Sequence, residues 1–276
     1  MPILRSIIRR YRTDGLGGVA NAFMRRLNSS RLRIHPLQVA LEEVMSNNDY
    51  TIVQLGAYVG DTANDPMFST IKQSSSQGLQ IGNGRCQIIL VEPVKQYFDE
   101  LRQNYSDVHG VHFENVAVAS ESGKATLYQL GVDPIDHGYP EWLSQLSSLK
   151  EERISQLVND DIKRFYMNHR VAHEVDCIKF DTLVERYSLT KIDLLQIDIE
   201  GYEYDLLRTI DFDSLPIRFI NYESEVMFGN KLKCERLLRS KGYCTMDYAQ
   251  DTFCFGRSDR QLIKRGVRGR SFSRRS

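Results

Sequence analysis

Two carboxylates close a short apolar run near residue 200. The run Ile192 to Ile197 ends in Asp198 and Glu200, and a helix-compatible segment follows from Tyr202. A run that is apolar on both faces is typical of a strand covered on both sides in a parallel α/β sheet. Because such sheets bind ligands beyond the carboxyl ends of their strands, we expect both acids to face a ligand. There they could accept a proton or cap the following helix. A divalent metal ion bridging these acids is an open alternative, but nothing in their spacing demands one and no metal ligand is predicted.

A glycine-containing turn follows another apolar run, Tyr50 to Leu55. It contains Gly56, Tyr58, Gly60 and Asp61. Glycine permits close approach of a ligand to the backbone, and the free N–H groups of a following helix suit a nucleotide-like ligand. A single Gly-x-x-x-Gly pair recurs by chance, so it indicates such a site only together with other features.

The next apolar run supplies one such feature. Cys86 to Val91 ends in Glu92, and adenosine-binding α/β folds hold ribose hydroxyls with an acid at this place. Together with the glycine turn, Glu92 is predicted to bind a ribose. Val111 to Ala119 reads as the third strand, with Asn115 and Ala117 at the position where an adenine edge would lie.

The end of the chain departs from simple strand–helix alternation. Tyr243 to Tyr248 and Thr252 to Phe255 alternate in hydropathy and are separated by only a short turn, which leaves no room for a crossover helix. This predicts an antiparallel hairpin, as in the seven-stranded sheet of S-adenosylmethionine-dependent methyltransferases. A nicotinamide-dependent dehydrogenase would continue with a helix and a sixth parallel strand, and the chain has no full Gly-x-Gly-x-x-Gly. The expected helices are Leu37 to Met45, Ala63 to Gln77, Val94 to Tyr105 and Lys231 to Lys241.

A long insertion covers residues 131–170, where no strand pattern is visible. It contains Trp142, the only tryptophan of the chain. Long insertions in compact domains are often lids or binding loops, so we expect this segment to bind the acceptor substrate, with a merely structural excursion as the alternative. His169 and His173 have the spacing of a helical metal pair, but without an evident third ligand a solvated or hydrogen-bonded pair is expected.

Charge divides the 276-residue chain into three parts. Residues 1–35 hold eight Arg and one acid, residues 260–276 hold seven basic residues and no acid, and the centre keeps a net charge of about −14. We expect a basic extension (1–35), one α/β domain (36–258) and a basic tail (259–276). An acidic centre argues against nucleic acid as its substrate. The N-terminus could be a basic amphipathic helix making peripheral membrane contact, an organelle presequence or a solvated extension.

The cysteines indicate the compartment. Five cysteines without a CxxC pair suit buried free thiols in a reducing environment, so a cytoplasmic location is expected. No apolar segment approaches the length of a transmembrane helix.

The ordered motifs resemble the FkbM-type methyltransferases over roughly residues 50–225. The similar segments are Ile52 to Asp61, Val91-Glu92-Pro93, Asp181 and, most specifically, Ile192 to Glu203. The resemblance implies a class I methyltransferase (Rossmann-like) fold, S-adenosylmethionine as donor, and O-methylation of a hydroxyl on a sugar, glycan or natural product.

Carried over by position, the resemblance assigns Gly56 and Gly60 to the methionine part of the donor, Glu92 to its ribose, and Asp198 with Glu200 to the reacting end. Two positions depart from the family pattern. Gln54 stands where Asp is usual, and Tyr58 where Asn is frequent. A neutral Gln54 supplies no negative charge for the donor's ammonium. It therefore motivates an alternative, a non-catalytic binding or scaffold protein with the same fold.

Overall fold

The computed structural model describes residues 34–62, 66–76, 86–151, 160–224 and 230–269. The basic extension expected at residues 1–35 lies outside the described residues except for its last two. Parts of the loops at 63–65 and 77–85, of the insertion at 152–159, and residues 225–229 and 270–276 also lie outside them.

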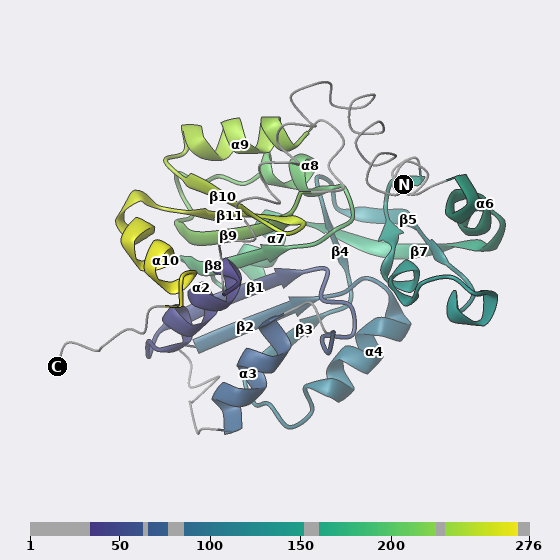
Figure 1. Ribbon diagram of the computed structural model, residues 1–276, viewed down its shortest axis with the longest axis horizontal. Helices are drawn as coiled ribbons and strands as arrows, with labels where there is room; N and C mark the ends of the chain where they lie inside the picture. Colours follow the sequence, from purple (N-terminus) through teal and green to yellow (C-terminus); the bar gives the residue numbers. More distant parts are fainter. Residues whose placement is uncertain (1–33, 63–65, 77–85, 152–159, 225–229, 270–276) are drawn as a thin grey trace.

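A seven-stranded sheet forms the centre of the molecule (Figure 1), in the order β10-β11-β9-β8-β1-β2-β3. Within this sheet β11 runs antiparallel to both neighbours and the other pairs are parallel. The predicted terminal hairpin is therefore present. The strands are β1 (Tyr50–Leu55), β2 (Cys86–Val91), β3 (Val111–Glu114), β8 (Ile192–Ile197), β9 (Ile217–Glu223), β10 (Cys244–Tyr248) and β11 (Asp251–Phe255).

Helices cover both faces of this sheet, which explains why its central strands are apolar on both sides. The first face is covered by α2 (Pro36–Met45), α3 (Pro66–Ser76), part of α4 (Lys95–Asn104) and α10 (Arg260–Gly266). The second face is covered by α7 (Phe180–Arg186), α8 (Glu203–Leu207) and α9 (Lys231–Ser240). None of the helices in the described part of the chain is both long and apolar enough to cross a membrane.

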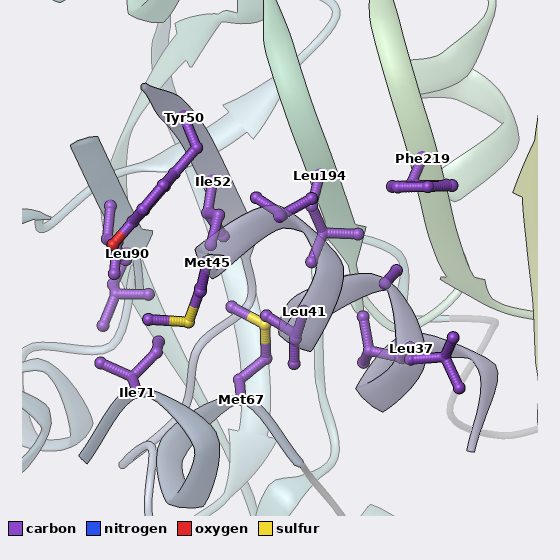
Figure 2. Close-up of a cluster of buried hydrophobic side chains, with 14 of the residues drawn as sticks. Leu37, Leu41, Met45, Tyr50, Ile52, Met67, Ile71, Leu90, Leu194 and Phe219 are labelled. Carbon is purple, nitrogen blue, oxygen red and sulfur yellow. The ribbon is translucent and has the colours of Figure 1, made fainter. Parts of the chain in front are cut away.

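The core under α2 fixes the strands that carry the predicted site. Figure 2 shows Leu41 and Met45 of α2 packed toward Ile52 of β1 and Leu194 of β8. All four side chains are at most 2% exposed. Burying a side chain of this size contributes about 1.5–3 kcal/mol, so this cluster stabilises the packing of α2 on β1 and β8.

A second sheet of four strands, in the order β4-β7-β5-β6, lies beside the first and was not predicted. Its strands are β4 (Ala117–Ala119), β5 (Gly123–Leu130), β6 (Ser147–Ser148) and β7 (Arg170–Lys179). The expected single strand from 111 to 119 is thus wrong, because the chain leaves the large sheet after Glu114. The Asn115 side chain marks this break, since its Nδ2 donates to the carbonyls of Glu92 (2.9 Å) and Pro93 (3.0 Å).

The insertion also holds more regular structure than expected. It contains the short 3-10 helices η1 (Ile135–His137) and η2 (Glu141–Gln145), the strand β6, and α6 (Asp160–His169). His169 ends α6 and His173 lies on β7, so the two histidines do not share a helix. His169 Nδ1 instead lies 2.9 Å from the carbonyl of Phe165, in agreement with a hydrogen-bonded role.

The C-terminal segment is part of the fold beyond the expected boundary at residue 258. After η3 (Arg257–Asp259), α10 buries Ile263, and the following Val267 is 1% exposed. A Cβ at Gly266 would lie 2.4 Å from Val39 Cγ1, so α10 packs closely on α2. The basic residues of α10 therefore lie on a docked helix. All five cysteines are free, and four of them are buried.

Candidate active site

Three carboxylates meet where two neighbouring strands end. Asp198 and Glu200 follow β8, and Glu223 ends β9, which pairs with β8 in parallel. One oxygen from each acid lies within 4.8 Å of the others. The structure thus brings together the two predicted catalytic residues and adds Glu223, which the sequence analysis did not select.

The loop that carries Asp198 and Glu200 has an unusual backbone. Glu200 has φ 51° and Gly201 φ 95°, so two successive residues lie in the left-handed region. The fully buried Glu203 stabilises this turn, because its Oε1 accepts hydrogen bonds from the backbone N–H groups of Ile199 (3.2 Å) and Gly201 (3.0 Å). Glu203 thereby holds the turn that precedes α8, whose N-cap residue Tyr202 makes no side-chain capping hydrogen bond.

Burial makes the acid cluster electrostatically unusual. Burial, followed by the charges of Asp198 and Glu203, raises the pKa of Glu200 well above its ordinary value. Burial, followed by the charges of Glu200 and Asp198, raises the pKa of Glu223 in the same direction. Glu200 and Glu223 have no ion pair with a described residue, whereas the Asp198 side chain is exposed. Such shifted carboxyl groups are common where a protein binds a cation or moves a proton.

The glycine turn lies directly against this cluster. The Asp198 N–H donates to the Leu55 carbonyl at 2.9 Å, and a Cβ at Gly56 would lie 1.7 Å from the Asp198 carbonyl oxygen. Gly56 has φ 78°, so both its conformation and its surroundings require glycine. At Gly60 (φ 80°) a Cβ would approach Tyr105 and Leu101 of the α4 region, so this second glycine serves helix packing.

Glu92 lies at the carboxyl end of β2, at the edge of the sheet where the glycine turn begins. It is 4% exposed, and its two oxygens accept hydrogen bonds from the N–H groups of Tyr58 (2.9 Å) and Val94 (2.8 Å). Burial raises the pKa of Glu92 to about 7, and these two bonds lower it in part. Each oxygen has a second lone pair, so the carboxylate keeps acceptor capacity for ribose hydroxyls.

Tyr58 occupies the strained position of the glycine turn. Its φ is 47°, a region that Asn adopts more readily than Tyr, which gives a physical reason for the frequent Asn in the family. The Tyr58 ring lies 4.5 Å from that of Tyr97, and the Tyr97 hydroxyl donates to the carbonyl of Ser144 in the insertion. Ring packing thus ties the turn to the insertion.

The other predicted donor-binding residues are not gathered at one point. Asp61 is exposed just beyond the turn, and the amide of Asn115 is engaged with the backbone after β2. Ala117 is buried on β4 and pairs with Cys177 in the second sheet. Donor binding by Asp61, Asn115 and Ala117 therefore stays a prediction.

Gln54 belongs to a row of polar side chains that crosses the sheet. It pairs in register with Gln196, which pairs with Asn221, and all three are buried. The Asn221 amide donates to Gln196 Oε1 (2.8 Å) and to Asp251 Oδ2 (2.7 Å). Amides at equal positions in consecutive strands are the sequence signal for this row, and the sequence analysis missed it.

The insertion reaches the acid cluster as well. Ser148 Oγ donates to the Glu200 carbonyl at 3.0 Å, and Lys150 forms an ion pair with Asp205 at the start of α8. The Lys150 ammonium also lies 4.9 Å from the centre of the Tyr202 ring. Residues 147–150 therefore lie beside the loop that carries the candidate catalytic acids.

The strand order, with one antiparallel strand next to the edge, defines the class I methyltransferase fold, and the acids lie at its carboxyl edge. The profile of the methyltransferase FkbM domain matches residues 54–243, more than half of the chain. The chain therefore belongs to the FkbM methyltransferase family, as its motifs predicted.

Among solved structures, the chain is similar to a ribosomal protein L11 methylase from Lactobacillus delbrueckii subsp. bulgaricus. That match has 10% identity, covers 79% of this chain and 74% of the other, and has a TM-score of 0.36. A precorrin-6y C5,15-methyltransferase from Geobacter metallireducens GS-15 matches with 11% identity, 81% and 89% coverage, and a TM-score of 0.37. No protein of curated function matches the chain.

Proposed function

We propose that this protein is an S-adenosylmethionine-dependent methyltransferase that methylates a hydroxyl oxygen of a sugar, glycan or natural product. The observation that carries the proposal is the contact between Gly56 and Asp198. It sets the glycine turn against the backbone carbonyl of Asp198, a residue whose side chain is exposed. In this proposal the turn that holds the donor and the residue that accepts the proton are neighbours at one edge of the sheet.

The residues at this edge fit such a donor. Glu92 has acceptor capacity left for the ribose hydroxyls after its two backbone hydrogen bonds, and the Gly56 turn would hold the methionine part. The buried oxygens Oε2 of Glu200 and Glu223 accept no hydrogen bond from the described residues. A cationic group bound at this edge would interact favourably with these two oxygens.

The chemistry divides between donor and protein. When bound, the donor supplies a methyl group that its sulfonium makes electrophilic. Asp198, as the exposed member of the cluster, accepts the proton of the acceptor hydroxyl or orients that hydroxyl. Glu200 supports it, because a second carboxyl nearby favours proton uptake by the pair.

The acceptor would be a small molecule or a glycan. Ser144 and Ser148 place the insertion against the turn and against the acid loop, in agreement with its expected role in acceptor binding. The acidic centre argues against nucleic acid, and free cysteines favour the cytoplasm or another reducing compartment.

A labelled-methyl transfer assay against pooled sugars, glycans and small metabolites tests this proposal. We expect Asp198→Asn to reduce kcat by about 10²–10⁴-fold, the usual contribution of a general base. Its affinity for S-adenosylmethionine should stay within a few-fold. Asp99→Asn, on the exposed face of α4, is the matched control and should leave kcat unchanged. Near-normal turnover of Asp198→Asn would refute the assignment of the base.

One observation favours a second candidate function, a non-catalytic binding or scaffold protein. Gln54 is a buried neutral amide where the family usually has Asp. If wild-type protein binds the donor but transfers no methyl group to any pool, and Gln54→Asp creates transfer, the scaffold function is supported.

A further inference from the structure

We propose that Asp198, Glu200 and Glu223 form a binding site for a hard divalent cation, Mg²⁺ in the cell. The ligand set consists of carboxylate oxygens from the ends of β8 and β9, with one oxygen of each acid within 4.8 Å of the others. Its use in catalysis rests on the proposed function, but cation binding itself does not. The spacing of the acids along the chain does not predict this site, because Glu223 joins the pair only when β9 lies beside β8.

The cluster holds acceptors that the protein does not satisfy. Glu200 Oε2 and Glu223 Oε2 are both shut off from solvent, and neither accepts a hydrogen bond from a described residue. Buried polar atoms are nearly always paired, so each such atom in a folded protein requires an explanation. Protonation would not remove the difficulty, because a buried carboxylic O–H is a donor that needs an acceptor of its own.

Within the described residues, no positive side chain forms an ion pair with the half-buried Glu200 or Glu223, whose Oε2 atoms are buried. Lys150 of the insertion is paired with Asp205, and neither Glu200 nor Glu223 takes part in an ion pair in this part of the chain. Three carboxylates in one place repel one another, and burial increases this repulsion. A bound divalent cation would neutralise most of this charge.

The ligand chemistry selects the type of cation. The three acids offer oxygen only, which suits Mg²⁺, Mn²⁺ or Ca²⁺, whereas the free cysteines lie on other parts of the fold. Three protein ligands would leave coordination positions for water or an acceptor oxygen. Glu200 and Glu223 form the buried side and Asp198 the exposed side, so these open positions face solvent.

This arrangement adds a role for the cation to the proposed reaction. A divalent ion on the exposed side would bind the acceptor hydroxyl and lower its pKa, which makes it easier to deprotonate. Asp198 would then orient the acceptor through the ion as well as by direct contact.

Titration of the full chain with Mn²⁺, followed by electron paramagnetic resonance of the free ion, tests this inference without donor or acceptor. We expect one Mn²⁺ per chain, displaced by excess Mg²⁺. Glu223→Gln and Asp198→Asn should each weaken binding at least about tenfold, whereas the exposed Asp99→Asn should bind as wild type. Circular dichroism of each variant checks that it is folded, and the exposed Asp198 is the safer position in this respect.

Two results would overturn the inference: wild-type protein without a stoichiometric Mn²⁺ site, or folded Asp198→Asn and Glu223→Gln variants that bind Mn²⁺ as tightly as wild type. Failure of methyl transfer alone would leave the cation site standing, since binding is measured in the absence of the reaction.

Discussion

At the scale of single residues, Gly56 joins the two halves of the candidate site. Its φ is 78°, and a Cβ at this position would lie 1.7 Å from the Asp198 carbonyl oxygen, which leaves no room for a side chain. We expect Gly56→Ala to lower the free energy of unfolding by about 3 kcal/mol. Of this, roughly 1–2 kcal/mol comes from the left-handed backbone and roughly 1–3 kcal/mol from overpacking. Urea denaturation measures the change.

Gly138 provides the matched control for this substitution. It has the same φ of 78°, but a Cβ there would meet nothing within 4 Å. Gly138→Ala should therefore lower the free energy of unfolding only by the cost of the left-handed backbone conformation, about 1–2 kcal/mol. Equal losses for the two variants would mean that the turn does not pack on Asp198 as described.

The individual site residues were predictable to different degrees. Asp198, Glu200 and Glu92 could be placed at the sheet edge, because each directly follows an apolar run. Glu223 also ends such a run, but its partner acids follow the preceding strand of the sheet and become neighbours only through strand pairing. The sequence analysis explained Gly56 by the close approach of a ligand to the backbone. The structure adds a second reason, because the backbone of Asp198 leaves no room for a side chain at position 56.

At the scale of elements, the start of α2 makes stability depend on pH. His35 caps this helix, since its Nδ1 accepts from the Leu37 N–H at 3.1 Å, and burial lowers its pKa to about 4 from an ordinary 6.5. The folded protein therefore keeps His35 neutral while the unfolded chain takes up a proton below pH 6.5. Its contribution is complete above that pH and is lost as the pH falls toward 4, by about 2–3 kcal/mol.

His35→Asn should remove this loss and keep the helix cap, because Asn is a good N-cap residue. The free energy of unfolding, measured by urea titration at pH 7 and pH 4.5, should fall less in His35→Asn than in wild type. The exposed His109→Asn is the control. An unchanged pH dependence in His35→Asn would show that other groups, such as Asp251 at 3.7 Å from His35, dominate acid unfolding.

Most elements of the large sheet could be predicted, because their apolar runs are separated by clear turns. The hairpin β10–β11 was recognisable from the alternating hydropathy of its two strands and from the short turn between them. The second sheet was not, since the chain passes from β3 to β4 without a glycine or proline, and a strand of three residues gives no periodicity. Only the hydrogen bonds of Asn115 show where the chain turns away.

At the scale of the whole molecule, the folded domain includes the helix that follows residue 258. Ile263 and Val267 are at most 1% exposed, so their removal would uncover α2. A chain shortened to residue 258 should lose at least about 2 kcal/mol of stability, the contribution of burying one or two aliphatic side chains. A chain shortened to residue 269 keeps α10 and should unfold at a higher denaturant concentration than the chain shortened to residue 258. Equal midpoints for the two shortened chains would contradict the packing of α10 on α2.

The charged residues near the end of the described chain and those of the acid cluster lie in different parts of the fold. The basic residues of α10 belong to the docked helix, whereas the acids that matter most lie together at the carboxyl edge of the large sheet. A single domain thus combines the glycine turn, Glu92 and the carboxylate cluster at one edge of the sheet. Binding of S-adenosylmethionine at that edge is the central claim.

Isothermal titration calorimetry with S-adenosylmethionine tests this claim most directly. We expect wild-type protein to bind one donor per chain. Glu92→Gln should bind about 10–100-fold more weakly, because it loses a charged hydrogen-bond acceptor worth about 1.5–3 kcal/mol. Glu114→Gln is the control, since this acid ends the next strand but is engaged by Arg186 and Tyr187, and it should bind as wild type. The absence of binding heat from wild-type protein at millimolar donor would contradict the claim.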